Sequence, residues 1–134
     1  MRKIYIVLIV TFGLFLTSCG GAAPTTTIDV ALTDFQFVPN EFTIPAGQEI
    51  TINAANNGAV VHNFVIMNYG TNAGDDWDAS DIPNIYWEIE VQPGESTSTS
   101  FTAPTEPGEY QFVCRTEGHI MAGMVGNIVV VAGE

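Results

Sequence analysis

The sequence has few basic residues, few cysteines and few histidines. Its 134 residues include three lysines and arginines, two cysteines and two histidines, against fifteen aspartates and glutamates, for a formal net charge of −12. A chain this acidic is repelled by the phosphate backbone of DNA or RNA. Nucleic acid is therefore excluded as a partner.

The sequence also lacks an apolar run long enough for a membrane-spanning helix, which needs about 20 residues. The run IYIVLIVTFGLFL has thirteen residues, follows the basic start MRK, and is typical of a secretory signal. The following LTSC, with Cys19, resembles the lipobox of bacterial lipoproteins, in which the cysteine becomes the lipidated first residue. We predict that residues 1–18 are a lipoprotein signal peptide, and the alternative is an ordinary signal with Cys19 incidental.

This prediction implies that the protein is exported and lipid-anchored, on the outer face of the cytoplasmic membrane or in the periplasm. Residues 19–27 then form a lipidated tether, because glycine, alanine, proline and threonine offer little to pack. Arg2 and Lys3 leave with the signal. Arg115 becomes the only basic residue, and the formal charge becomes −14, one positive against fifteen negative.

With Cys19 lipidated, Cys114 has no cysteine with which to form an internal disulfide. Exported domains that need covalent stabilisation usually pair their cysteines. An unpaired thiol in an oxidising compartment must therefore be protected or used.

No part of the chain after the signal has a sustained helical repeat, and apolar and polar residues instead alternate with period two. Turn sequences such as PAG, NNG and QPGE separate the alternating segments. The pattern predicts an all-β domain over residues 28–134, a Greek-key β-sandwich or barrel of about eight strands. We expect the strands at residues 26–32, 41–44, 49–55, 60–67, 85–91, 96–101, 109–114 and 125–131, with a long surface loop at 68–84.

The chemistry-bearing residues gather in the stretch FVCRTEGHIMAGMVG, where His119 follows Cys114, and Met124 follows His119, after gaps of four residues. Two histidines and a cysteine with a weak axial methionine form blue-copper electron-transfer sites. The other histidine, His62, lies on a predicted strand that a sandwich can bring beside this loop. Taken alone, Cys114 could be an apolar filler and His62 a hydrogen-bonded core histidine, and Met121 competes with Met124 for the axial place.

The segment HNF, residues 62–64, and the segment PGEYQFVCRTEGHIMAGMVGNIVVV resemble the cupredoxins, the plastocyanin and azurin family of type 1 copper proteins. The loop behind a lipoprotein-like leader is also similar to that of the auracyanins of phototrophic bacteria. The resemblance implies a cupredoxin-like fold that holds one copper ion, Cu(II) or Cu(I), through His62, Cys114, His119 and Met124. It also implies that Asn63 ties the two ligand loops together.

The function implied by the resemblance is electron transfer by a monomer, not catalysis. A site closed by four protein ligands leaves no open position for a substrate, and no histidine remains for a second copper. Redox proteins such as a cytochrome or a membrane electron-transfer complex are the expected partners, docked on an apolar collar of Ile120, Met121 and Ala122 around an edge-exposed His119. The alternative is a copper-binding chaperone or metal-buffering lipoprotein, because the same ligands bind Cu(I).

Overall fold

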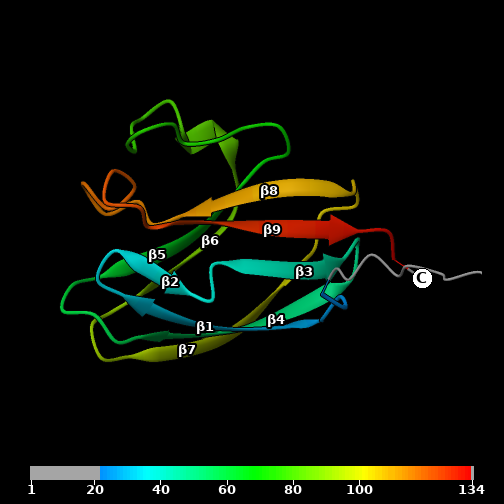
Figure 1. The fold of residues 1–134 in the computed structure, drawn as a ribbon, viewed down its shortest axis with the longest axis horizontal. Helices are drawn as coiled ribbons and strands as arrows, with labels where there is room; N and C mark the ends of the chain where they lie inside the picture. Colours follow the sequence, from blue (N-terminus) through cyan, green and yellow to red (C-terminus); the bar gives the residue numbers. More distant parts are fainter. Residues whose placement is uncertain (1–21, 134) are drawn as a thin grey trace, which may run out of the picture.

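The computed structural model describes residues 22–133, so the predicted signal peptide, Cys19 and the start of the tether lie outside the described residues. Within this range, nine strands form two sheets packed face to face (Figure 1). The four-stranded sheet has the order β2 (Gln36–Val38), β1 (Thr27–Thr33), β4 (Glu49–Asn56), β7 (Ser96–Thr102). The five-stranded sheet has the order β3 (Glu41–Pro45), β9 (Val125–Val131), β8 (Gly108–Val113), β5 (His62–Met67), β6 (Ile85–Val91).

The all-β prediction is confirmed, and the strand missing from it is β2. This strand is three residues long and pairs with the end of β1 through a tight turn, with Thr33 opposite Gln36. A segment this short shows no periodic pattern that distinguishes it from a turn.

The core lies between the sheets, where the period-two alternation places every second side chain. β1 and β4 bury alternate residues, including Ile28, Leu32, Ile50 and Ile52. At the centre, Phe64 of β5 stacks on Phe112 of β8, with ring centroids 4.4 Å apart. The two strands that carry metal-ligand candidates at their ends are thereby fixed against each other by a buried aromatic pair.

The long loop at residues 68–84 is only partly a surface feature. It contains one short 3-10 helix, η1 (Ile82–Asn84), and it packs Ala73 and Trp77 against Val65, Met67 and Val113 on the outer side of the five-stranded sheet. All six residues of β5 are buried as a result. The prediction of a surface excursion was therefore wrong for the part of the loop that forms this second cluster.

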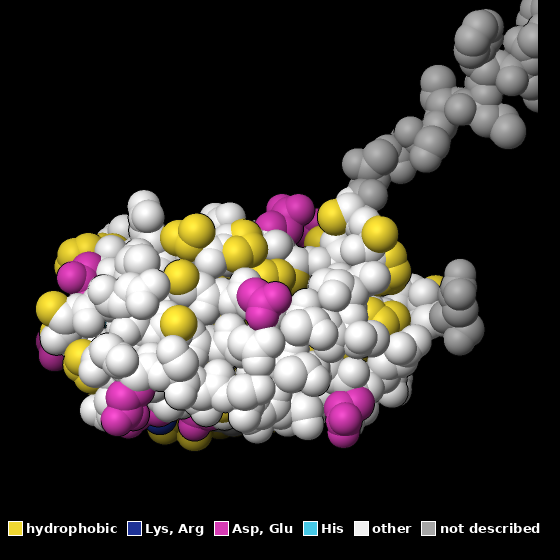
Figure 2. Space-filling model, turned by 90° about the horizontal axis from the view of Figure 1, so that it is seen from below, with side chains coloured by type: hydrophobic (Ala, Val, Ile, Leu, Met, Phe, Trp, Pro, Cys, Tyr) yellow, Lys and Arg dark blue, Asp and Glu magenta, His cyan; other side chains and the backbone are white. Residues whose placement is uncertain are grey.

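The two ends of the sandwich differ in what they carry. Figure 1 shows the β8–β9 loop and the β1–β2 turn at one end, and the first described residues at the other end, near the C-terminus. Seen from below, the surface carries scattered carboxylates and scattered apolar side chains, and almost no basic groups (Figure 2). Within residues 22–133, no helix has the length and apolar character needed to cross a membrane.

Candidate metal centre

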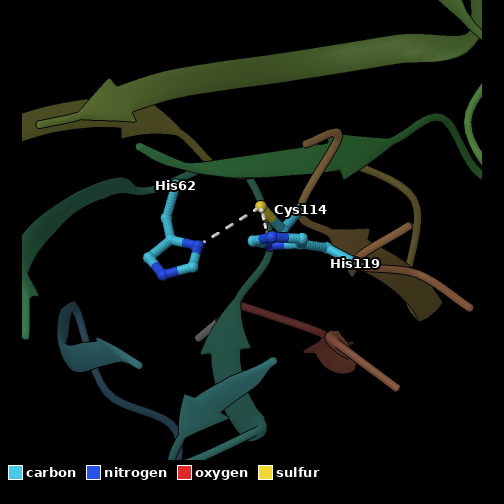
Figure 3. Close-up of side chains that lie close together, drawn as sticks. All are labelled: His62, Cys114 and His119. Carbon is cyan, nitrogen blue, oxygen red and sulfur yellow. Dashed lines mark hydrogen bonds between the residues drawn. The ribbon is translucent and has the colours of Figure 1, made fainter. Parts of the chain in front are cut away.

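Three of the four predicted ligands, His62, Cys114 and His119, lie close together (Figure 3). His62 begins β5, and Cys114 follows the last residue of β8. β5 and β8 are antiparallel neighbours with Val65 opposite Val113, so the pairing brings the two ligands together although they are 52 residues apart. The Sγ atom of Cys114 lies 3.7 Å from Nδ1 of His62 and 3.5 Å from Nδ1 of His119.

These three ligand atoms lie within 4.8 Å of one another, the only such cluster with a histidine or cysteine in the described part of the chain. His62 and Cys114 are fully buried, and His119 is 5% exposed. Two imidazole nitrogens and a thiolate, shielded from water, are a donor set for copper or zinc rather than for a hard cation such as Mg²⁺.

The fourth candidate, Met124, is held at the site by the backbone of the loop. Its N–H donates to the carbonyl of His119 at 2.9 Å, and its carbonyl accepts from the N–H of Cys114 at 3.2 Å. The loop can turn this tightly because Gly118 and Gly123 have positive φ angles of 77° and 99°. Met124 is fully buried in the same core cluster as Cys114, whereas Met121 is 71% exposed. The position of Met121 at the surface leaves Met124 as the methionine of the site.

Two residues connect the strand that carries His62 to the ligand loop. The backbone N–H of Asn63 donates to Sγ of Cys114 at 3.4 Å. Thr116 donates through its hydroxyl to the carbonyl of Val61 at 2.9 Å, and the same hydroxyl lies 3.4 Å from Oδ1 of Asn63. The sequence analysis missed Thr116, because a threonine between a cysteine and a histidine carries no distinctive pattern.

Burial also determines the charge of the two histidines. It lowers the pKa of both below the usual 6.5, and for His62 the proximity of His119 lowers the pKa further. The carboxylate of Asp34 opposes this effect at both rings. A neutral imidazole that carries its proton on Nε2 has a lone pair on Nδ1, and this form can bind a metal ion through Nδ1.

The β1–β2 turn contributes two contacts that the sequence analysis did not foresee. Oδ1 of Asp34 lies 3.5 Å from Nε2 of His62, and the ring of Phe35 meets the ring of His119 edge to face, with centroids 5.2 Å apart. Phe35 is 49% exposed. No sequence signal could have found these residues, because the turn is remote from both histidines along the chain.

The expected docking collar needs two corrections. Ile120 is 6% exposed and packs with Val65 and Val113 in the second core cluster, so it does not belong to the surface. The ring of His119 is also largely covered, at 5% exposure, instead of standing open at the edge. Ala122 is exposed, as is Met121.

Residues 24–131 match the model of the copper binding proteins of the plastocyanin/azurin family. The chain belongs to this family. The fold and the convergence of His62, Cys114 and His119 agree with that membership. Together with Met124, these residues form a type 1 site for one copper ion, with ligands from the start of β5 and from the loop that connects β8 to β9.

Similar members of the plastocyanin/azurin family come from bacteria and plants. The chain is 32% identical to auracyanin-B of Chloroflexus aurantiacus, a match that covers 81% of this chain and 52% of that protein. It is 36% identical to plastocyanin of Mercurialis perennis, over 72% of this chain and 89% of that one. The chain thus spans about half the length of auracyanin-B and most of the plastocyanin.

The fold is similar to solved structures of the same group. The crystal structure of dithionite-reduced auracyanin from the photosynthetic bacterium Roseiflexus castenholzii matches with a TM-score of 0.70 and 32% identity. The match covers 81% of this chain and 99% of that one. Essentially the whole of that auracyanin therefore has a counterpart in the sandwich described here.

Proposed function

We propose that this protein is an exported, lipid-anchored carrier of single electrons. The observation that carries the proposal is the burial of the site: Met124, His62 and Cys114 are fully buried and His119 is 5% exposed. A site enclosed in this way has no room to bind and turn over a substrate. Copper, when bound there, supplies a couple between Cu(I) and Cu(II), since imidazole, thiolate and thioether ligands suit both oxidation states.

The protein's own contribution is to hold the ligands together. The hydrogen bonds from Asn63 to Cys114 and from Thr116 to Val61 fix the ligand loop against the strand that carries His62, and the bond from Met124 to His119 closes the loop on itself. The stack of Phe64 on Phe112 supports both sides of the site from the core. Little rearrangement is then required when an electron arrives or leaves, which favours a carrier.

The surface beside His119 is suited to contact with a redox partner such as a cytochrome or a membrane electron-transfer complex. Phe35 is 49% exposed and touches the ring of His119, and Met121 is 71% exposed on the ligand loop. With Ala122, these residues replace the collar expected from the sequence. The negative charge of the whole chain favours a basic partner.

Anchoring at Cys19 is compatible with a partner that docks beside His119. The first described residues, which lead into β1, lie at the end of the sandwich opposite the ligand loop (Figure 1). We propose that this end of the sandwich faces the membrane and that the ligand loop faces away from it.

The experiment is to purify the domain without residues 1–19 and load it with copper. We expect one copper ion per chain, strong visible absorption from thiolate-to-copper charge transfer, and a reversible one-electron wave in cyclic voltammetry. Cys114→Ser should abolish the absorption, whereas Thr105→Ser, a conservative change in the loop before β8, should retain it. A copper buffer would bind Cu(I) without a reversible wave, and that result would replace the proposed function by the chaperone alternative.

A further inference from the structure

The turn between β1 and β2 contacts both histidine ligands although it contributes no ligand itself. Asp34 faces the outer nitrogen of His62, and Phe35 packs on the ring of His119. Phe35 has a φ of +68°, a left-handed conformation that is uncommon for a bulky residue. A tight turn with positive φ at its third position usually has glycine or asparagine there. Such a conformation persists where the surroundings hold it in place.

His62 presents a buried nitrogen that needs an acceptor. Nδ1 points at Sγ of Cys114, while Nε2 points away from the sulfur (Figure 3). When Nδ1 is used for a metal, the neutral ring carries its proton on Nε2. Nε2 is buried and has no hydrogen-bond partner of good geometry among the described residues. A buried donor without a partner lowers the stability of the folded protein, so an acceptor at this position raises it.

The carboxylate of Asp34 faces this nitrogen. Its Oδ1 atom lies 3.5 Å from Nε2, at the long limit for a hydrogen bond. The same oxygen accepts the backbone N–H of Ala59 at 3.0 Å, which fixes the carboxylate beside the loop that leads into β5. A Cβ atom on Gly58 would overlap both Nε2 of His62 and Oδ1 of Asp34. The absence of a side chain at Gly58 is what allows the pair to approach.

We propose that Asp34 is a positioning residue of the copper site, which accepts the Nε2 proton of His62 and lowers the reduction potential by its negative charge. A carboxylate on the outer nitrogen of a ligating histidine fixes the tautomer and raises the basicity of the ring. Both effects stabilise Cu(II) more than Cu(I), since the ion with more charge gains more from a basic ligand and a nearby anion. This inference rests on the proposed copper function.

The first test measures the reduction potential of the copper-loaded protein by voltammetry. In Asp34→Ala, the affinity for Cu(II) should fall about 10-fold relative to that for Cu(I). That ratio corresponds to an upward shift of about 59 mV for a one-electron couple. The matched control is Glu49→Gln, which removes one charge at the exposed start of β4, at the opposite end of the sandwich. It should leave the potential close to that of the parent.

The second test follows the Nε2 proton of His62 by NMR in the protein loaded with zinc, which is diamagnetic and needs no redox activity. In the parent, the proton should exchange slowly with water, and in Asp34→Ala about 10-fold faster, because its acceptor is lost. Asp34→Asn keeps an oxygen acceptor without the charge. It should restore slow exchange while the potential stays raised, which a merely structural role of Asp34 would not produce.

The proposal is wrong if Asp34→Ala matches Glu49→Gln in either the potential or the proton exchange. Failure of the proposed function has a different signature, namely a parent protein without blue colour or a reversible wave. In that event the zinc-loaded protein still decides whether Asp34 pairs with His62. Because Asp34 is half-exposed, its replacement should not prevent folding.

Discussion

Replacing the two methionines of the ligand loop is the sharpest test of the fourth ligand. Met124 is fully buried beside Cys114, and Met121 is 71% exposed. Met124→Leu removes a weak axial donor that supports mainly Cu(II), so the reduction potential should rise. Met124→Gln introduces an oxygen donor, which favours Cu(II), so the potential should fall. Met121→Leu should change neither the potential nor the visible spectrum.

The burial of the two side chains sets the expected changes in stability. Leucine and methionine have similar volumes, so Met124→Leu should lower the free energy of unfolding of the copper-free protein by less than about 1.5 kcal/mol. Met121→Leu at the surface should change it by no more than about 0.5 kcal/mol. Met124→Gln buries an amide, which costs about 1–3 kcal/mol if it finds no partner. Part of that loss should be recovered on copper loading, when the amide oxygen has an ion to bind.

The assay combines cyclic voltammetry and visible spectroscopy of the loaded variants with urea denaturation of the copper-free forms. The three variants and the parent differ only within the ligand loop, so each serves as a control for the others. If Met121→Leu shifts the potential while both Met124 variants match the parent, the axial ligand is Met121 and the role assigned to the buried methionine is refuted.

Three further predictions concern pH, location and the partner. Burial lowers the pKa values of His62 and His119 below 6.5, so the unfolded chain binds protons more readily than the folded protein. The stability of the copper-free protein should therefore be fully present above pH 6.5 and should fall as the pH drops toward the lowered pKa values. Denaturation at a series of pH values measures this, and a stability independent of pH would contradict the assignment. Full-length protein should partition into membrane fractions, and Cys19→Ala should release it or block processing; a mature N-terminus without acyl groups, found by mass spectrometry, would remove the anchor. Stopped-flow rates with a basic cytochrome should fall as salt is added, because the Debye length is about 10 Å at 0.1 M, and rates that rise or stay flat would exclude electrostatic attraction to such a partner.

Much of the site could be predicted from the sequence because its chemistry is local. Cys114, His119 and Met124 are close along the chain, and their spacing specifies a loop that can surround one ion. The strands could be predicted for a similar reason, since alternation along β1 and β4 records directly which side chains face the core. His62 was identifiable because only one other histidine exists.

The surroundings of the ligands could not be predicted, because they depend on contacts between segments far apart in the chain. Ile120 looks like a rim residue beside Met121, yet it is buried, since the loop at residues 68–84 folds over the five-stranded sheet and covers it. The polar composition of that loop indicates an exposed segment. Only the packing of Ala73 and Trp77 in the structure shows that part of the loop covers the sheet. The same limit applies to β2, whose three residues pair with β1 through a turn too short to show a pattern.

The sequence by itself determined the ligand types, their loop and the all-β architecture, because residue chemistry and short-range periodicity are written along the chain. Only the tertiary structure decided what surrounds the ligands. Asp34 reaches Nε2 of His62 because the β1–β2 turn and the loop before β5 meet at one end of the sandwich, where Gly58 leaves room for both groups. Such proximity follows from how two sheets pack, which no spacing along the chain encodes.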